Sequence, residues 1–252
     1  MSPSYPVAVQ LYSLRERSSE DFAAVLEEVA AMGYDGVEPF NLYGMSPRAF
    51  RTRLDELGLR LASSHYPWAN RTDSSELIDA LGELNLHRAI GGFGSDDFKT
   101  PSAIARTIEQ TQQLSEQLAT AGISLCLHNH WWEYELDQDE PAYYALQRAV
   151  PNVEFELDTY WAANFGARDP VAELSRIADR TPLLHIKDGP LVADAAHTAV
   201  GDGVMPVTEL IAAANPNRLE WLIVELDTCA TDVSAAVAKS LAFLRGTGVA
   251  PV

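Results

Sequence analysis

The sequence has few cysteines and no long apolar segment. Only two cysteines, Cys126 and Cys229, occur in 252 residues, which argues against a disulfide framework and fits a reducing compartment. No apolar run approaches the roughly 18 residues that could span a bilayer. The first residues also lack the basic and apolar regions of a secretory signal. We therefore expect a cytoplasmic protein that is not embedded in a membrane.

Basic residues are scarce as well. The chain has 18 Lys and Arg against 36 Asp and Glu, which gives a formal net charge of −18. A surface that binds nucleic acid or an anionic membrane needs a basic face to displace counterions. The sequence therefore predicts neither kind of partner. Its hydrophobic content of 47% and charged content of 21% are typical of a globular protein and argue against disorder.

Short apolar runs alternate with longer amphipathic segments along the whole chain. The amphipathic segments carry helix signals, such as Ser46-Pro47 before one of them and Gly58 after it, because proline suits the first helical position and glycine the end. The apolar runs read as buried strands. They lie at residues 7–12, 34–39, 59–65, 88–92, 123–128, 153–158, 183–187 and 221–226.

The number of these strand–helix units predicts the fold. About eight units in about 250 residues match a closed (β/α)₈ TIM barrel. No linker rich in proline, serine or charge interrupts the series, so we expect residues 1–252 to form a single domain. A doubly wound open sheet is the alternative, but its first turn is usually rich in glycine, whereas residues 10–15 contain none.

Polar side chains recur at the ends of the predicted strands, where a barrel of this kind carries its chemistry. A single one could cap a loop or be a hydrogen-bonded core histidine. Clustered carboxylates without a cation would repel one another and raise their pKa values, and a bound divalent metal removes that penalty. The residues in question are Gln10, Glu38, His65, His128, His130, Asp158, His185 and Glu225.

Asp158, His185 and Glu225 form the strongest candidate metal site, at the ends of the last three strands. Mixed carboxylate and imidazole ligands suit Mn²⁺, Co²⁺, Fe²⁺ or Zn²⁺, and Mg²⁺ less well. Lys187 points the same way as His185, because strand side chains alternate. Its ammonium could hydrogen-bond a substrate oxygen or pair with one of the surplus carboxylates.

Residues 128–135 hold the next candidate site residues. His128 ends a strand and Glu133 follows in the loop, so either could complete the metal's ligand set. Trp131 and Trp132 between them could form an apolar wall on which a sugar ring stacks, or could pack within the loop.

The sequence resembles the xylose isomerase-like TIM barrels of the sugar phosphate isomerase/epimerase family. The resemblance covers nearly the whole chain, and its His-Asn-His and His-x-Lys-Asp segments are specific in combination. The matching segments are Val9-Gln10-Leu11-Tyr12-Ser13-Leu14-Arg15, Gly33-Tyr34-Asp35-Gly36-Val37-Glu38, Ser64-His65-Tyr66-Pro67, His128-Asn129-His130 with Glu133, Leu157-Asp158-Thr159-Tyr160-Trp161, His185-Ile186-Lys187-Asp188 and Val224-Glu225-Leu226-Asp227.

The resemblance implies one divalent metal held by Glu, Asp, His and Glu from the last four strands. Asp158, His185 and Glu225 match that pattern. The fifth-strand glutamate falls on His128, so we take Glu133 as the substitute carboxylate, with His128 as the alternative. Mn²⁺ is the first candidate ion, with Co²⁺, Zn²⁺, Fe²⁺ and Mg²⁺ as alternatives.

The resemblance also implies a sugar isomerase or epimerase that removes a proton alpha to the carbonyl of a ketose or keto-sugar. Glu225 is the first candidate base, and His65 or His128 the second. The same site could instead expel a beta oxygen, as a dehydratase or lyase of a keto-sugar, keto-glycoside or inosose. The residues that we expect to contact the substrate are Gln10, Glu38, Trp132 and Lys187.

Two other classes of protein fit the sequence less well. Related barrels include zinc endonucleases, but the net charge of −18 opposes binding of a polyanion. The acidic and imidazole residues argue against a sugar-binding barrel without chemistry. No basic cluster for a phosphate is evident, which favours an unphosphorylated sugar. Exposed barrel helices often pair, so a homo-oligomer is compatible with this fold.

Overall fold

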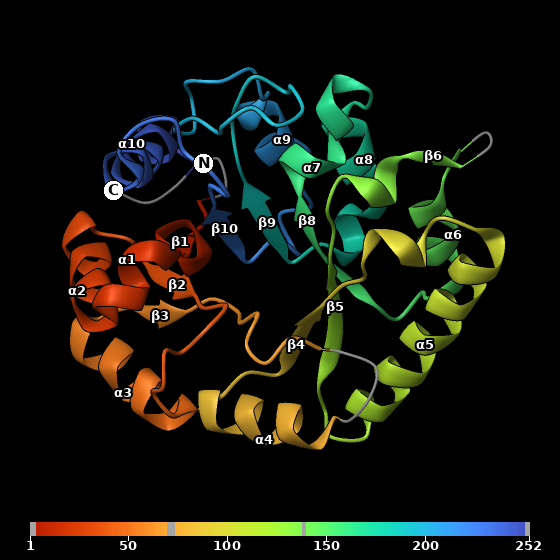
Figure 1. Ribbon diagram of the computed structural model, residues 1–252, viewed down its shortest axis with the longest axis horizontal. Helices are drawn as coiled ribbons and strands as arrows, with labels where there is room; N and C mark the ends of the chain where they lie inside the picture. The colour runs from red at the N-terminus through yellow and green to blue at the C-terminus, as the bar shows by residue number, and fades with distance from the viewer. Residues whose placement is uncertain (1–3, 70–73, 138–139, 250–252) are drawn as a thin grey trace.

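Eight parallel strands surround the centre of the molecule in a computed structural model that describes residues 4–69, 74–137 and 140–249. Figure 1 shows these strands at the centre, enclosed by helices. Each strand is short, and all except the third are almost wholly buried. The strands are β1 (Val7–Gln10), β2 (Gly36–Glu38), β3 (Arg60–Leu61), β4 (Arg88–Gly91), β5 (Ser124–His128), β8 (Glu154–Asp158), β9 (Leu183–Ile186) and β10 (Trp221–Val224).

The sheet curls until its edges meet. Its order is β3-β2-β1-β10-β9-β8-β5-β4, so the first and last strands of the chain are neighbours. The two edges approach at a parallel bridge between Ala69, which follows β3, and Gly91 in β4. Together with the helices, this topology is the predicted (β/α)₈ barrel.

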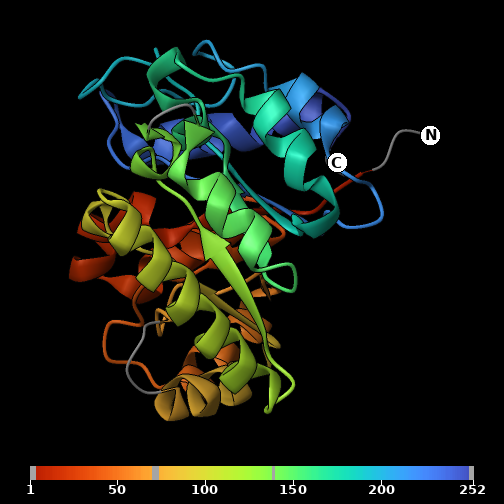
Figure 2. The same cartoon turned by 90° about the vertical axis from the view of Figure 1, so that its right-hand side faces the viewer.

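The helices lie on the outer side of the strands, and Figure 2 shows α5 and α6 from that side. Among the described residues, no helix is long and apolar enough to cross a membrane. The helices are α1 (Arg15–Glu20), α2 (Phe22–Met32), α3 (Pro47–Leu57), α4 (Ser75–Leu84), α5 (Pro101–Ala119), α6 (Ala142–Ala149), α7 (Thr159–Ala162), α8 (Pro170–Ile177), α9 (Val207–Ala213) and α10 (Val233–Gly246).

The predicted helix ends rest on local chemistry. The Ser46 side chain accepts the Ala49 N–H at the start of α3, and Gly58 ends that helix in the left-handed conformation at φ 70°. The third strand is shorter than predicted: only Arg60–Leu61 pair with β2, although the strand was expected over 59–65. A short hairpin of β6 (Leu136–Asp137) and β7 (Glu140–Pro141) was not predicted.

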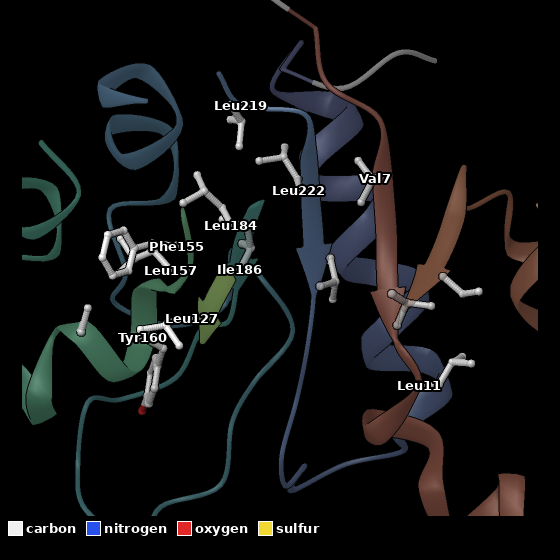
Figure 3. Packing of buried hydrophobic residues seen from close by; sticks show 14 of the residues in the cluster. Val7, Leu11, Leu127, Phe155, Leu157, Tyr160, Leu184, Ile186, Leu219 and Leu222 are labelled. Atoms are coloured by element: carbon white, nitrogen blue, oxygen red, sulfur yellow. The ribbon is translucent and has the colours of Figure 1, made fainter. Parts of the chain in front are cut away.

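Apolar side chains fill two spaces. The larger cluster packs the outer side of the strands against the helices, and Figure 3 shows part of it, including Leu157 and Leu184. A smaller cluster occupies the barrel interior below the polar rim. Within it the Trp221 ring lies against Gly36, where a Cβ atom would collide with the Arg60 carbonyl. The interior cluster consists of Ala8, Ala62, Ile90, Cys126, Leu183, Trp221 and Ile223.

Candidate functional site

Along the strands, the side chains that face the barrel interior change from apolar to polar near the carboxyl ends. We call the polar groups at these ends the polar layer. Side chains two residues apart on a strand point the same way. Leu183 therefore shares the interior with His185 and Lys187, and Ile223 shares it with Glu225, just beyond the end of β10. The polar groups at the carboxyl ends of the strands therefore lie next to the apolar interior cluster.

Four of these side chains converge. Three come from strands β5, β8 and β9, and the fourth comes from the residue that follows β10. Donor atoms of His128, Asp158, His185 and Glu225 all lie within 4.8 Å of one another. His185 Nδ1 is 2.8 Å from Glu225 Oε2 and 3.2 Å from His128 Nε2. His128 Nε2 is 3.8 Å from Asp158 Oδ2. We call these four residues the outer set.

Glu133 does not join the outer set. Its side chain is buried, and its Oε2 accepts the backbone N–H of His130 at 2.9 Å. Burial raises the pKa of this carboxyl group. Of the two alternatives for the fourth ligand, the structure brings His128 and not Glu133 into contact with the other three residues.

Lys187 neutralises part of the charge of this layer. Its side chain is 1% exposed, and its Nζ lies 2.8 Å from Asp158 Oδ2, 3.0 Å from Glu225 Oε2 and 2.9 Å from Asp227 Oδ2. Burial alone would lower the pKa of Lys187, but the three carboxylates outweigh it and raise that pKa well above its usual value. Lys187 therefore carries its charge at neutral pH.

Gln10 and Glu38 lie behind the outer set and do not reach the surface. Both side chains are fully buried, which does not fit the substrate contact predicted for them. Gln10 Nε2 donates to Glu38 Oε1 at 2.6 Å, and the same oxygen lies 2.8 Å from His185 Nε2. A carboxylate on the far nitrogen of a metal-binding histidine fixes its orientation and tautomer. Burial opposes ionisation, but His65 and His185 lower the pKa of Glu38 to about 2.

Glu156 is the site residue that sequence reasoning missed. It is fully buried, and its Oε2 lies 2.6 Å from His65 Nε2 and 3.4 Å from His185 Nε2. Burial and the nearby Glu38 carboxylate raise the pKa of Glu156 to about 7. Its spacing of two from Asp158 was the available signal, because both must face the barrel interior.

A cavity of about 570 Å³ opens above the outer set. Its polar floor includes His65, His128 and Glu225, and Lys187 is the one lysine or arginine among the described lining residues. Trp132 lines the wall, and its Nε1 donates to the Phe93 carbonyl at 3.1 Å. Most of the wall is aromatic, with Tyr12, Phe40, Trp68, Phe93, Trp131, Trp132 and Trp161.

The sequence profile of the xylose isomerase-like TIM barrel family matches residues 26–247. The chain belongs to this family. No curated protein matches it significantly.

Solved structures share the fold over almost the full length. A sugar phosphate isomerase/epimerase from Parabacteroides distasonis has 23% identity and a TM-score of 0.74, covering 99% of this chain and 96% of that one. A probable 3-DHS dehydratase from Bacillus anthracis has 14% identity and a TM-score of 0.72, covering 95% and 98%. D-psicose 3-epimerase from Clostridium cellulolyticum has 16% identity and a TM-score of 0.70, covering 97% and 99%.

The outer set of this family member fits a divalent ion. Ligand atoms bound tetrahedrally at 2.0–2.1 Å lie about 3.3 Å apart. Three of the six separations in the outer set, at 2.8, 3.2 and 3.8 Å, bracket that value, and the others lie within 4.8 Å. Burial and the neighbouring histidines lower the pKa of His128 well below its usual value, so its ring is neutral and able to bind a metal. Asp158 Oδ2 is buried, and its close contact in the described residues is the 2.8 Å ion pair with Lys187 Nζ, which lies outside hydrogen-bond geometry.

The loop after β9 is held by one carboxylate. Asp188 is 1% exposed, and its two oxygens accept four backbone N–H groups at 2.8–3.1 Å. A Cβ atom on Gly203 would collide with this carboxylate. The four donors belong to Gly189, Gly201, Gly203 and Met205.

Replacing Asp188 with alanine will lower the free energy of unfolding by about 2–6 kcal/mol, because the hydrogen bonds from Gly189 and Met205 are buried and each buried N–H left without a partner costs about 1–3 kcal/mol. Urea unfolding followed by circular dichroism measures the change. Asp202→Ala is the matched control, since Asp202 is 42% exposed and pairs with Lys239 at the surface. Equal losses in the two variants would show that Asp188 does not organise the loop.

Proposed function

We propose that this protein is a divalent-metal-dependent sugar isomerase or epimerase that acts on a ketose or keto-sugar. The observation that carries the proposal is the outer set at the floor of an aromatic cavity. Asp158, His185, Glu225 and His128 would hold the ion, with Mn²⁺ as the first candidate and Co²⁺, Zn²⁺, Fe²⁺ or Mg²⁺ as alternatives. When bound, the ion supplies a Lewis acid that stabilises negative charge developing on a sugar oxygen.

The floor of the cavity offers groups that can move a proton. Glu225 lines the cavity at 5% exposure. Burial opposes its ionisation, but Lys187 and His185 lower the pKa of Glu225 well below its usual value, so it is present as the carboxylate that a general base requires. His65 lines the same floor and is the second candidate for moving the proton. A proton returned from another side of the sugar would change the stereochemical outcome.

The cavity favours a neutral substrate. Lys187 is already surrounded by three carboxylates, so the described lining offers no free cation to bind a phosphate. The aromatic walls suit the apolar face of a sugar ring. Both cysteines are free thiols, which supports a cytoplasmic location in this proposal. We expect no nucleic-acid partner. Self-association through the outer helices is compatible with this fold.

A dehydratase or lyase is the second candidate reaction. The likeness in fold to a probable 3-DHS dehydratase supports this candidate. Proton NMR of a panel of ketoses, inososes and 3-keto-glycosides with added Mn²⁺ separates the candidates. Isomerisation and epimerisation conserve the composition of the sugar, whereas a lyase releases water or an alcohol.

Glu225→Gln will slow exchange of the substrate's alpha proton with deuterium oxide by about 10²–10⁴-fold, the usual contribution of a general base. The readout is proton NMR on the best ketose of the panel, with metal content measured in parallel to separate loss of the base from loss of the ion. Glu220→Gln is the control, because Glu220 is 49% exposed and pairs with Arg88 before β10 begins. Unchanged exchange in Glu225→Gln would exclude Glu225 as the base.

A further inference from the structure

Four more donor atoms converge directly beneath the outer set. Glu38 Oε1, His65 Nε2, Glu156 Oε2 and His185 Nε2 form a closed ring of neighbours. The successive separations are 3.3 Å from Glu38 to His65, 2.6 Å from His65 to Glu156, 3.4 Å from Glu156 to His185, and 2.8 Å from His185 back to Glu38. We call these four residues the inner set.

The chemistry of the inner set is that of a metal site. It offers two imidazole nitrogens and two carboxylate oxygens, a combination that suits Zn²⁺ or Co²⁺. Tetrahedral ligands at 2.0–2.1 Å lie about 3.3 Å apart. The separations of 3.3 and 3.4 Å already match that value, and the hydrogen bonds of 2.6 and 2.8 Å would open by about 0.5–0.7 Å on binding an ion. The side chains of Glu38, Glu156 and His185 are fully buried, and that of His65 is 12% exposed.

Two further observations support ligation at this place. Glu156 Oε1 is buried and has no hydrogen-bond partner, so the protein leaves part of this carboxylate unsatisfied. Glu38 is held from behind by Gln10 Nε2 and by the Ser63 hydroxyl, which donates to its other oxygen. Such outer partners are what orient the ligands of metal sites.

The charge of the polar layer leads to the same inference. Five carboxylates lie in this layer, and Lys187 is the one lysine or arginine whose contacts with them are seen in the described residues. One divalent ion in the outer set leaves two negative charges uncompensated, and burying unpaired charge is costly. A second divalent ion adds two positive charges but leaves one negative charge uncompensated, because a His185 ring that binds both ions is an imidazolate and itself carries one negative charge. The carboxylates are Glu38, Glu156, Asp158, Glu225 and Asp227.

We propose that the inner set is a second cation site for an ion of the Zn²⁺ or Co²⁺ class, adjacent to the outer set. His185 lies between the two sites and presents Nε2 to the inner set and Nδ1 to the outer set. Ligand nitrogens must be deprotonated, so binding releases the proton on His65 Nε2 and leaves the shared His185 ring as an imidazolate. The ion lowers the net negative charge of the barrel interior and does not depend on which sugar is bound.

The competing arrangement holds protons in place of the second ion. Protonated His65 and a protonated Glu156 would balance the same charge through hydrogen bonds. The two arrangements differ in the number of ions per chain, which can be counted without a substrate.

The experiment is a metal count on the full chain. Protein stripped with a chelator is refilled with Co²⁺ and dialysed, and the bound ions are measured by mass spectrometry and by the visible absorption of tetrahedral Co²⁺. We expect two ions per chain in the wild type, one in Glu156→Gln and one in Asp158→Asn. Glu154→Gln is the matched control on the same strand and should keep both, since Glu154 pairs with Arg88 and Arg218 away from the site.

The outcomes separate this inference from the proposed function. One ion in the wild type that is lost in Asp158→Asn but kept in Glu156→Gln overturns the inner site and leaves the outer one standing. No ion in the wild type overturns both. If Glu156→Gln fails to fold by circular dichroism, the wild-type count still decides, and His65→Gln then tests the inner set.

Discussion

His185→Gln will lose bound metal and turnover together. His185 is the one residue that belongs to both the outer and the inner set, and it lies 2.8 Å from a carboxylate on each side of its ring. A glutamine side chain cannot present donors on two opposite edges. Apparent zinc-binding energies of 10–16 kcal/mol over four ligands amount to about 2.5–4 kcal/mol per ligand, so metal affinity should fall about 10²–10³-fold.

The measurement is the metal content after dialysis against a fixed Mn²⁺ concentration, with turnover of the best ketose assayed on the same samples. His87→Gln is the control, because His87 is exposed in the turn before β4. Asp158→Asn serves as a second variant if His185→Gln does not fold. Full metal content in a folded His185→Gln protein would contradict the assignment of His185 as a ligand.

Lys187→Met will destabilise the metal-free protein by about 3–5 kcal/mol. That is the usual cost of removing one partner of a buried ion pair, since the charge left behind has no compensation. Here three carboxylates, Asp158, Glu225 and Asp227, would lose the ammonium group that lies within 3.0 Å of each. Methionine keeps most of the side-chain volume, so the loss reports charge more than packing.

Urea unfolding in chelator and in excess Mn²⁺ tests this expectation. Added Mn²⁺ should restore more stability to Lys187→Met than to the wild type, because the ion takes over the neutralisation. Lys239→Met is the matched control: Lys239 is 61% exposed and pairs with Asp202, so its loss should cost less than about 1 kcal/mol. Similar values for the two variants would mean that the carboxylates are protonated without Lys187.

The barrel could be predicted because its signals are local. Alternation between buried strands and amphipathic helices follows from side-chain periodicity, and helix ends follow from single residues. Gly58, for example, ends α3 in the left-handed conformation. The third strand was overestimated because its pairing beyond Leu61 depends on where β2 ends and on the bridge between Ala69 and Gly91.

The sequence predicted which residues form the polar layer, but only part of how their side chains are arranged. Asp158, His185 and Glu225 come together as their places at neighbouring strand ends suggested. Glu156 was overlooked because it stands between Phe155 and Leu157 and was read as part of an apolar run. Glu38 was expected in the cavity, yet it lies beneath it and contacts His185.

The amino-acid sequence alone determined the order and type of the elements and the kinds of group at the barrel mouth, because periodicity and capping act over a few residues. Only the tertiary structure decided which of these groups face one another. The 2.8 Å contact between His185 and Glu38, residues 147 apart in the chain, depends on the stagger and curvature of the closed sheet. That geometry is a property of all eight strands together and is written in no single one of them.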